Sequence, residues 1–138
     1  MPIDRKTPSK PRRSEIRRPL TGKELRIDSI AKELLGRVQL PCNVVFSKYD
    51  IHVIGRHVAL KSGRCYLVIN SYADISVPEH IILHEAAHHG GKSGEKSHGP
   101  EWANRLLRMY EETGISLPGS TKHESFAKLC NLRLRGGR

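Results

Sequence analysis

Residues 76–91 read SVPEHIILHEAAHHGG, and this stretch carries the clearest structural signal in the chain. Ser76-x-x-Glu79 is a capping-box pattern, and the proline between these two residues suits the first turn of a helix. The apolar residues that follow are typical of a helix buried in a core, and the two glycines at the end are a common stop signal. The stretch therefore predicts a short, buried helix with its own start and stop.

His84, Glu85 and His88 on this helix have the spacing of a metal site. Residues i and i+4 lie one above the other on a helix, so the two imidazoles can hold one ion. Zinc suits two imidazoles and an open coordination position, and it lowers the pKa of bound water to about 7. Glu85 can reach that water and take its proton. The motif predicts a Zn²⁺ cofactor, His84 and His88 as ligands, and Glu85 as general base.

The five-residue motif alone also occurs by chance in helices that bind no metal. Its surroundings favour a metal site here, because the residues around the histidines are apolar rather than charged. Five of the eight histidines also fall within nineteen residues, at positions 80, 84, 88, 89 and 98. No spacing argument reaches His52, His57 or His123, and we expect an ordinary core or surface role for these three.

A catalytic zinc site needs a third protein ligand. The pattern HExxHxxGxxH is excluded, because Gly94 stands where its third histidine would be. Two options remain. One is a glutamate on the next helix, Glu111 or Glu112. The other is His98, in a Gly-rich loop that can turn the chain back towards the first helix.

The elements HEAAH at 84–88 and HGPEW at 98–102 together resemble the SprT-like zinc metalloproteases. In that family an HExxH helix is followed by an HGxxF/W element whose histidine is the third zinc ligand. The resemblance implies that His98 is the third ligand and that Trp102 packs beside the site. It also implies an α+β, minimal zincin-like domain that cleaves peptide bonds. The cysteine pairs of the zinc ribbon found in several members are missing from this sequence.

The flanking sequence predicts a helix, a small sheet and further helices around the motif. Thr21-x-x-Glu24 is another capping box, and apolar residues follow at helical spacing as far as Gly36. Short β-rich runs separated by turns then predict a mostly antiparallel sheet. Its strands are expected at 43–46, 51–54, 58–60 and 65–69, with a hairpin turn at 61–64. After the motif, a helix is expected from 100 to about 114 and a short helix within 123–132.

The apolar strand 65–69 has two interpretations. Its composition is typical of a strand covered on both faces. The family resemblance adds that it pairs with an extended substrate through main-chain hydrogen bonds. Three tyrosines, Tyr66, Tyr72 and Tyr110, are candidate oxyanion donors, and the sequence selects none of them.

The net charge of +10 belongs to the two ends of the chain. Residues 1–26 contain nine Lys/Arg against three Asp/Glu, and residues 122–138 contain five against one. The stretch between them has ten of each, so it has the charge balance of an ordinary globular domain. We expect a basic tail at 1–20, one metallopeptidase domain at 21–121 and a basic C-terminal segment at 122–138.

The first twenty residues combine four prolines with many basic side chains, which predicts disorder. Their densest cluster is Arg12, Arg13, Arg17 and Arg18. These side chains either neutralise the phosphates of a nucleic acid or are simply solvated.

The three cysteines, Cys42, Cys65 and Cys130, include no CxxC pair. A zinc ribbon is therefore excluded and a disulfide framework is unfavoured, so we expect reduced thiols in a cytoplasmic protein. The sequence shows neither a signal-peptide pattern nor a transmembrane segment, and no membrane partner is expected.

The leading functional prediction is a zinc metallopeptidase that acts on a protein or peptide and is recruited to nucleic acid by its ends. Two alternatives stay open. A nucleic-acid-binding accessory protein would hold structural zinc in a closed four-ligand site, completed by His89 or a cysteine. A hydrolase of another amide would use the same zinc, water and Glu85 chemistry.

Overall fold

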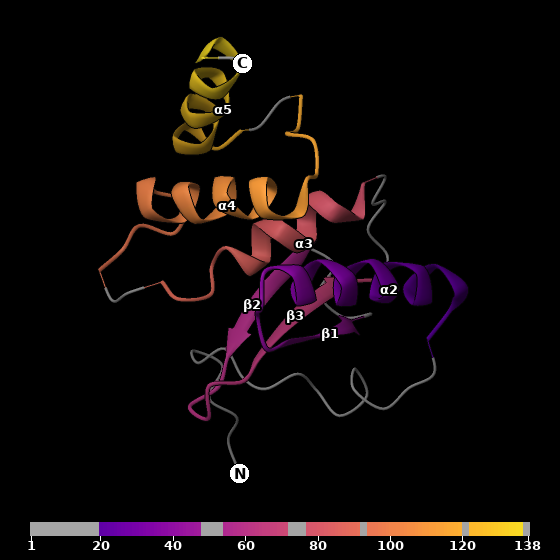
Figure 1. Ribbon diagram of the computed structural model, residues 1–138. Helices are drawn as coiled ribbons and strands as arrows, with labels where there is room; N and C mark the ends of the chain where they lie inside the picture. The colour runs from indigo at the N-terminus through magenta and orange to yellow at the C-terminus, as the bar shows by residue number, and fades with distance from the viewer. Residues whose placement is uncertain (1–19, 48–53, 72–76, 92–93, 120–121, 137–138) are drawn as a thin grey trace.

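The computed structural model describes residues 20–47, 54–71, 77–91, 94–119 and 122–136 (Figure 1). The predicted basic tail, apart from Leu20, and most of the predicted strand 51–54 lie outside these ranges. The described residues form an α+β fold of four helices and one three-stranded sheet, which confirms the predicted class. The elements are α2 (Gly22–Arg37), β1 (Cys42–Ser47), β2 (Gly55–Ala59), β3 (Cys65–Asn70), α3 (Pro78–Ala86), α4 (Pro100–Thr113) and α5 (Glu124–Gly136).

The sheet has the strand order β1-β3-β2, so β3 lies in the centre. β2 and β3 form the predicted hairpin, in which the Leu60 amide donates to the Arg64 carbonyl at 2.8 Å. Gly63 makes the turn possible with a φ of 92°. β1 pairs with β3 in parallel. The prediction of a mostly antiparallel sheet is therefore wrong: β1 and β2 lie on opposite edges of β3, and only the pairing of β2 with β3 is antiparallel.

The two faces of the sheet have different neighbours. Cys65, Leu67 and Ile69 alternate along β3, and the last two pack with α2, α3 and α4 in the main core. Their register partners on β1 are Cys42, Val44 and Phe46. The intervening residue Val68 lies on the other face, in a smaller cluster with Val45 and Val58. The helices therefore cover one face, and that face carries both cysteines of the sheet.

The helices begin and end at residues that cap helix termini. Thr21 and Glu24 form the predicted capping box of α2, with the two backbone-to-side-chain bonds at 3.0 and 3.2 Å. α3 begins at Pro78 after the N-cap Val77, and the predicted cap Ser76 lies outside the described residues. α4 begins at Pro100 and ends at Gly114, whose φ of 74° suits a helix C-terminus.

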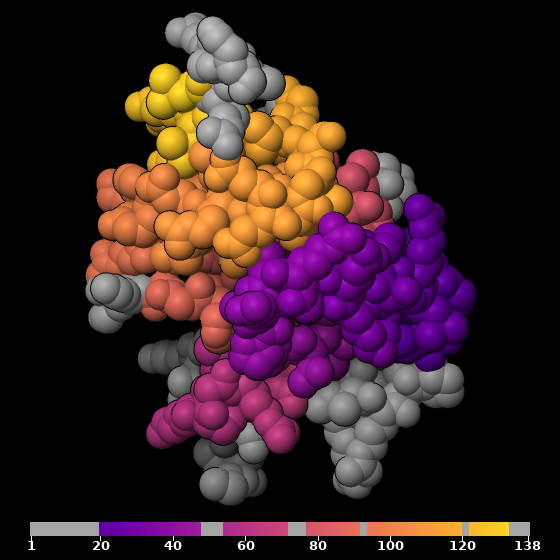
Figure 2. Space-filling view, viewed as in Figure 1, coloured from indigo at the N-terminus to yellow at the C-terminus, as the bar shows by residue number. Residues whose placement is uncertain are grey.

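The helices form layers on the sheet. α2 and α3 pack next to the strands, α4 packs on α3, and α5 packs on α4 (Figure 1). Figure 2 shows one face of the molecule, on which the C-terminal part of α4 meets α2, and Arg37 of α2 donates to the carbonyl of Thr113 at 3.0 Å. Phe126 and Cys130 of α5 belong to the same buried cluster as Trp102 and Tyr110 of α4. Residues beyond 121 therefore contribute to the main core. None of the helices among the described residues is both long and apolar enough to cross a membrane.

Candidate metal centre

The end of α3 and the turn after it present the predicted motif. His84 and the buried Glu85 lie on the last helical turn, and His88 follows just past the helix end. The amide of His88 donates to the Glu85 carbonyl at 3.1 Å, which tightens this turn. The rings of His84 and His88 have centres 5.4 Å apart, so both imidazoles lie on one side of the helix end.

His98 joins these two side chains from the loop before α4. Its Nε2 lies 3.2 Å from the Nε2 of His84, and its ring centre is 5.0 Å from those of both His84 and His88. Three imidazoles bound tetrahedrally to one zinc ion have ring centres about 5 Å apart. The ring centres of the three imidazoles therefore have about this spacing, and the donor type is one that zinc prefers, whereas by ligand atoms His84 groups with His98 and with His88 in two separate sets.

A fourth imidazole, that of His123, lies against the same group. It stacks on His98 with ring centres 3.9 Å apart and lies 5.2 Å from His84. Potential ligand atoms within 4.8 Å of one another form two sets that share His84, one with His98 and His123, the other with Glu85 and His88. No spacing pattern indicates a role for His123, because its approach to the other histidines depends on the packing of α5 against α4.

Trp102 packs against the histidines of the centre. It is fully buried, and its Nε1 donates to the carbonyl of His84 at 3.2 Å. Its ring lies edge-on to His84 at 4.9 Å and to His98 at 4.7 Å. It also stacks on His88 with ring centres 5.7 Å apart, so the tryptophan packs against all three proposed ligands and holds the helix end that carries the motif.

Arg105 bonds both the turn after α3 and the loop before α4. Its Nε donates to the carbonyl of Ala87 at 2.7 Å, and its two terminal nitrogens bond both carboxylate oxygens of Glu95. A guanidinium suits such bidentate pairing. One side chain on α4 therefore holds both the turn before His88 and the loop that leads to His98. No pattern in the sequence indicates this role for Arg105.

Burial sets the protonation of the centre. It lowers the pKa of His84 to about 3, and the neighbouring imidazoles of His88 and His98 lower this pKa as well. Burial also lowers the pKa of His88 to about 4 and those of His98 and His123 below their usual value. These imidazoles are neutral at pH 7, and the neutral form is the one that binds metals.

Glu85 shows the opposite shift. Burial raises the pKa of its carboxyl to about 7. Its Oε2 lies 3.6 Å from the Nε2 of His84, beside the histidines. A carboxyl that titrates near neutral pH can both accept and return a proton.

The other candidates lie away from this group. Glu111 and Glu112 are exposed, and they lie more than about 13 Å along α4 from Trp102 at the helical rise of about 1.5 Å per residue. The hydroxyl of Tyr110 is buried against Nδ1 of His80 at 2.7 Å. Tyr66 lies on the sheet face away from the helices, and Tyr72 lies outside the described residues.

The strand expected to pair with substrate is also a different one. β3 has a partner strand on each edge, so the interpretation of 65–69 as a substrate-pairing strand is wrong. β2 forms the edge of the described sheet on the side of α3. A Cβ at Gly55, where β2 begins, would lie 3.3 Å from Cγ of Glu85.

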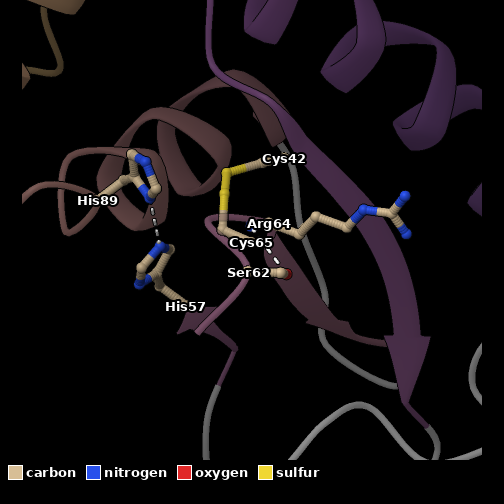
Figure 3. The surroundings of a disulfide bond; sticks show 6 residues. All are labelled: Cys42, His57, Ser62, Arg64, Cys65 and His89. Atoms are coloured by element: carbon tan, nitrogen blue, oxygen red, sulfur yellow. Dashed lines mark hydrogen bonds between the residues drawn. A yellow bond between two sulfur atoms is a disulfide. The ribbon is translucent and has the colours of Figure 1, made fainter. Parts of the chain in front are cut away.

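A second set of potential ligands lies at the end of the sheet, and we call it the Cys–His cluster: Cys42, His57, Cys65 and His89. Cys42 and Cys65 form a disulfide, so the prediction of reduced thiols is wrong for this pair (Figure 3). The cysteines begin two strands whose pairing the sequence did not reveal. Nε2 of His57 lies 3.2 Å from Nδ1 of His89, so these two histidines also have a specific contact.

Comparisons with models of known protein families, with curated proteins and with solved structures found no match.

Proposed function

We propose that the chain is a zinc-dependent metallopeptidase of the SprT-like, zincin type. The observation that carries this proposal is the convergence of three neutral imidazoles, those of His84, His88 and His98, beside the buried carboxyl of Glu85. A group of three histidines with an adjacent glutamate is the arrangement that metal-dependent hydrolysis needs.

In the proposed reaction each residue has one task. His84, His88 and His98 hold the zinc ion, which when bound polarises a substrate carbonyl and makes water more acidic. Glu85 accepts the proton of the attacking water on its carboxylate and passes it to the leaving amine. In the metal-free site burial raises the pKa of this carboxyl to about 7, and a zinc ion beside it would favour the carboxylate, the form that accepts the proton. Trp102 and Arg105 act as positioning residues, because they hold the backbone that carries the ligands.

The edge strand β2 supports a peptide substrate over another amide. A peptide in extended conformation can add to the edge of a sheet through main-chain hydrogen bonds. β2 begins beside Glu85, so a strand added there would bring its peptide bonds close to the centre. We propose an unfolded or extended protein segment as substrate. Recruitment to nucleic acid through Arg12, Arg13, Arg17 and Arg18 is a further proposal, and these residues lie outside the described ranges.

The test is hydrolysis of a labelled, unfolded protein by the zinc-loaded chain, the chelated chain and Glu85→Gln. Glutamine has the same shape but cannot accept the proton, so we expect a loss of about 10²–10⁴-fold in kcat with one equivalent of zinc retained at this centre. Zinc content is measured on the same samples. Undiminished hydrolysis by Glu85→Gln would contradict the mechanism.

A second candidate function rests on the stacking of His123 on His98. If His123 is a fourth ligand, the site is closed, and its zinc is structural, as in a nucleic-acid-binding accessory protein. His123→Ala separates the two. A large loss of zinc affinity, with no hydrolysis by the parent chain, supports the closed site, whereas unchanged zinc binding with hydrolysis supports the peptidase.

A further inference from the structure

We propose that the Cys–His cluster is a second zinc site, which binds one Zn²⁺ when the disulfide between Cys42 and Cys65 is reduced. This inference does not depend on the proposed peptidase activity, because it concerns four other side chains.

The sheet itself brings the two sulfurs together. Cys42 and Cys65 are direct register partners in the parallel pair of β1 and β3, with Cα atoms 4.6 Å apart. Neighbouring strands are about 4.7–4.9 Å apart in any sheet, so this distance is set by strand pairing. Side chains at paired positions point to the same face. The two sulfurs therefore remain neighbours when the bond between them is opened.

The two imidazoles approach the sulfurs from separate elements. His57 lies on β2, two residues from Ala59, which pairs with Cys65. Since side chains alternate along a strand, His57 shares the face of its register partner Leu67 and thus of Cys65. His89 comes from the turn after α3. Figure 3 shows the rings of His57 and His89 pointing towards one another beside the disulfide.

The distances and the donor types fit zinc. In a tetrahedral site, two bound nitrogens lie about 3.3 Å apart and two bound sulfurs about 3.8 Å apart. The nitrogens of His57 and His89 are 3.2 Å apart, and all four potential ligand atoms lie within 4.8 Å of one another. Two thiolates with two imidazoles are a common donor set of closed structural zinc sites. The disulfide and the metal are alternatives, because a sulfur in a disulfide has no thiolate to offer.

The change between the two forms balances with a thiol as reductant. Two reductant thiols give two electrons and two protons to the disulfide, and they leave as their own disulfide. The S–S bond breaks and two cysteine thiols form. Zn²⁺ then displaces the two thiol protons to solvent, and two zinc–sulfur bonds form.

The site would connect the sheet to the turn that carries His88. His88 and His89 are consecutive, and their side chains belong to the candidate metal centre and to the Cys–His cluster respectively. Zinc at the cluster would hold this turn to β1, β2 and β3. In the oxidised form, His89 of this turn contacts His57 of β2.

The experiment measures zinc per chain after a thiol or phosphine reductant, excess zinc and gel filtration without oxygen. We expect the reduced chain to hold one zinc ion more than the oxidised chain. The double variant Cys42→Ser/Cys65→Ser should lose this additional ion, whereas the matched control Cys130→Ser, at a buried thiol outside the cluster, should retain it. Equal zinc content in the reduced and oxidised forms would overturn the proposal.

Cobalt gives a second readout that is independent of the proposed catalytic centre. Co²⁺ bound by thiolates shows a sulfur-to-metal charge-transfer band in the near ultraviolet. We expect this band in reduced wild type and in His84→Ala, but not in Cys42→Ser/Cys65→Ser. His89→Ala leaves the strands unchanged and should weaken cobalt binding at least 10-fold. A missing band in reduced, folded wild type contradicts the second site, whereas loss of the His84 centre alone leaves the band in place.

Discussion

His98 is the residue on which the proposed centre depends most. It comes from a loop, yet its Nε2 lies 3.2 Å from that of His84. Sequence spacing left Glu111 and Glu112 open as third ligands, and the structure places both on the exposed side of α4. The geometry therefore supports the histidine.

His98→Ala should weaken zinc binding more than about 100-fold, since even residues that only support a ligand contribute about 10–100-fold. Glu111→Ala is the matched control and should bind zinc as the parent does. Competition with a chromogenic chelator measures both affinities. A weakened Glu111→Ala with an unaffected His98→Ala would reverse the assignment.

Arg105 combines two contacts that make it a positioning residue, one to the carbonyl of Ala87 and one to Glu95. Arg105→Leu should lower the free energy of unfolding by about 1–3 kcal/mol, as expected when hydrogen bonds to a charged group are lost. Zinc affinity should fall about 10-fold as the turn loosens.

The control for this variant is Arg108→Leu, an exposed arginine on the same helix, which should change stability by less than about 0.5 kcal/mol. Urea unfolding and zinc titration check both variants. Equal effects of the two substitutions would mean that Arg105 contributes only charge.

At the scale of the elements, α5 completes the core. Phe126 is 2% exposed and stacks on Tyr110 with ring centres 5.7 Å apart. Phe126→Ala should reduce the free energy of unfolding by about 3–5 kcal/mol, the usual cost of removing a buried ring.

Leu132 on the same helix is 64% exposed, so Leu132→Ala is the control and should have little effect. Urea denaturation with a single transition measures both. If Phe126→Ala unfolded α5 alone and left the rest unchanged, residues 122–138 would be a separate segment, as their charge suggested.

The elements also show how far local sequence patterns reach. The capping box at Thr21 and the hairpin turn at Gly63 are set by neighbouring residues, and both were predictable. The parallel direction of β1 was not, because a strand's side-chain pattern is the same in either direction. The disulfide depends on that pairing, and the contact of His57 with His89 depends on the packing of α3 against β2, so neither could be predicted.

The residues of the candidate centre also differ in how far they could be predicted from the sequence. His84, Glu85 and His88 could be predicted because they are close in sequence, and the tight turn after Ala86 keeps His88 near His84. His98 needed the family resemblance, and His123 needed the packing of α5 on α4. Ligands from separate elements are a property of the tertiary fold.

For the whole molecule, buried histidines make stability depend on pH. Burial lowers the pKa of His57 to about 4, as it lowers those of His84 and His88. The folded chain therefore binds fewer protons than the unfolded chain between pH about 4 and 6.5, and stability falls as the pH falls through this range. Glu85, with its raised pKa, acts in the opposite direction between pH about 4.5 and 7.

Three strongly shifted histidines outweigh one glutamate, so the metal-free chain should lose stability from pH about 6.5 down to about 4. Urea midpoints of the chelated protein across this range provide the measurement. Bound zinc competes with protons and should raise the midpoint at pH 6.5. A midpoint that stays constant or increases on acidification would show that these imidazoles are not buried in the neutral form.

Trp102 is the single tryptophan of the chain, and it contacts His84 and His98 directly. The tryptophan fluorescence of the protein therefore originates at this one position. A charged imidazole next to an indole quenches its emission, and an ion held by the same imidazoles changes the local field. Light emitted by the unlabelled protein should thus report the occupancy of the centre in real time, without a dye or an engineered probe.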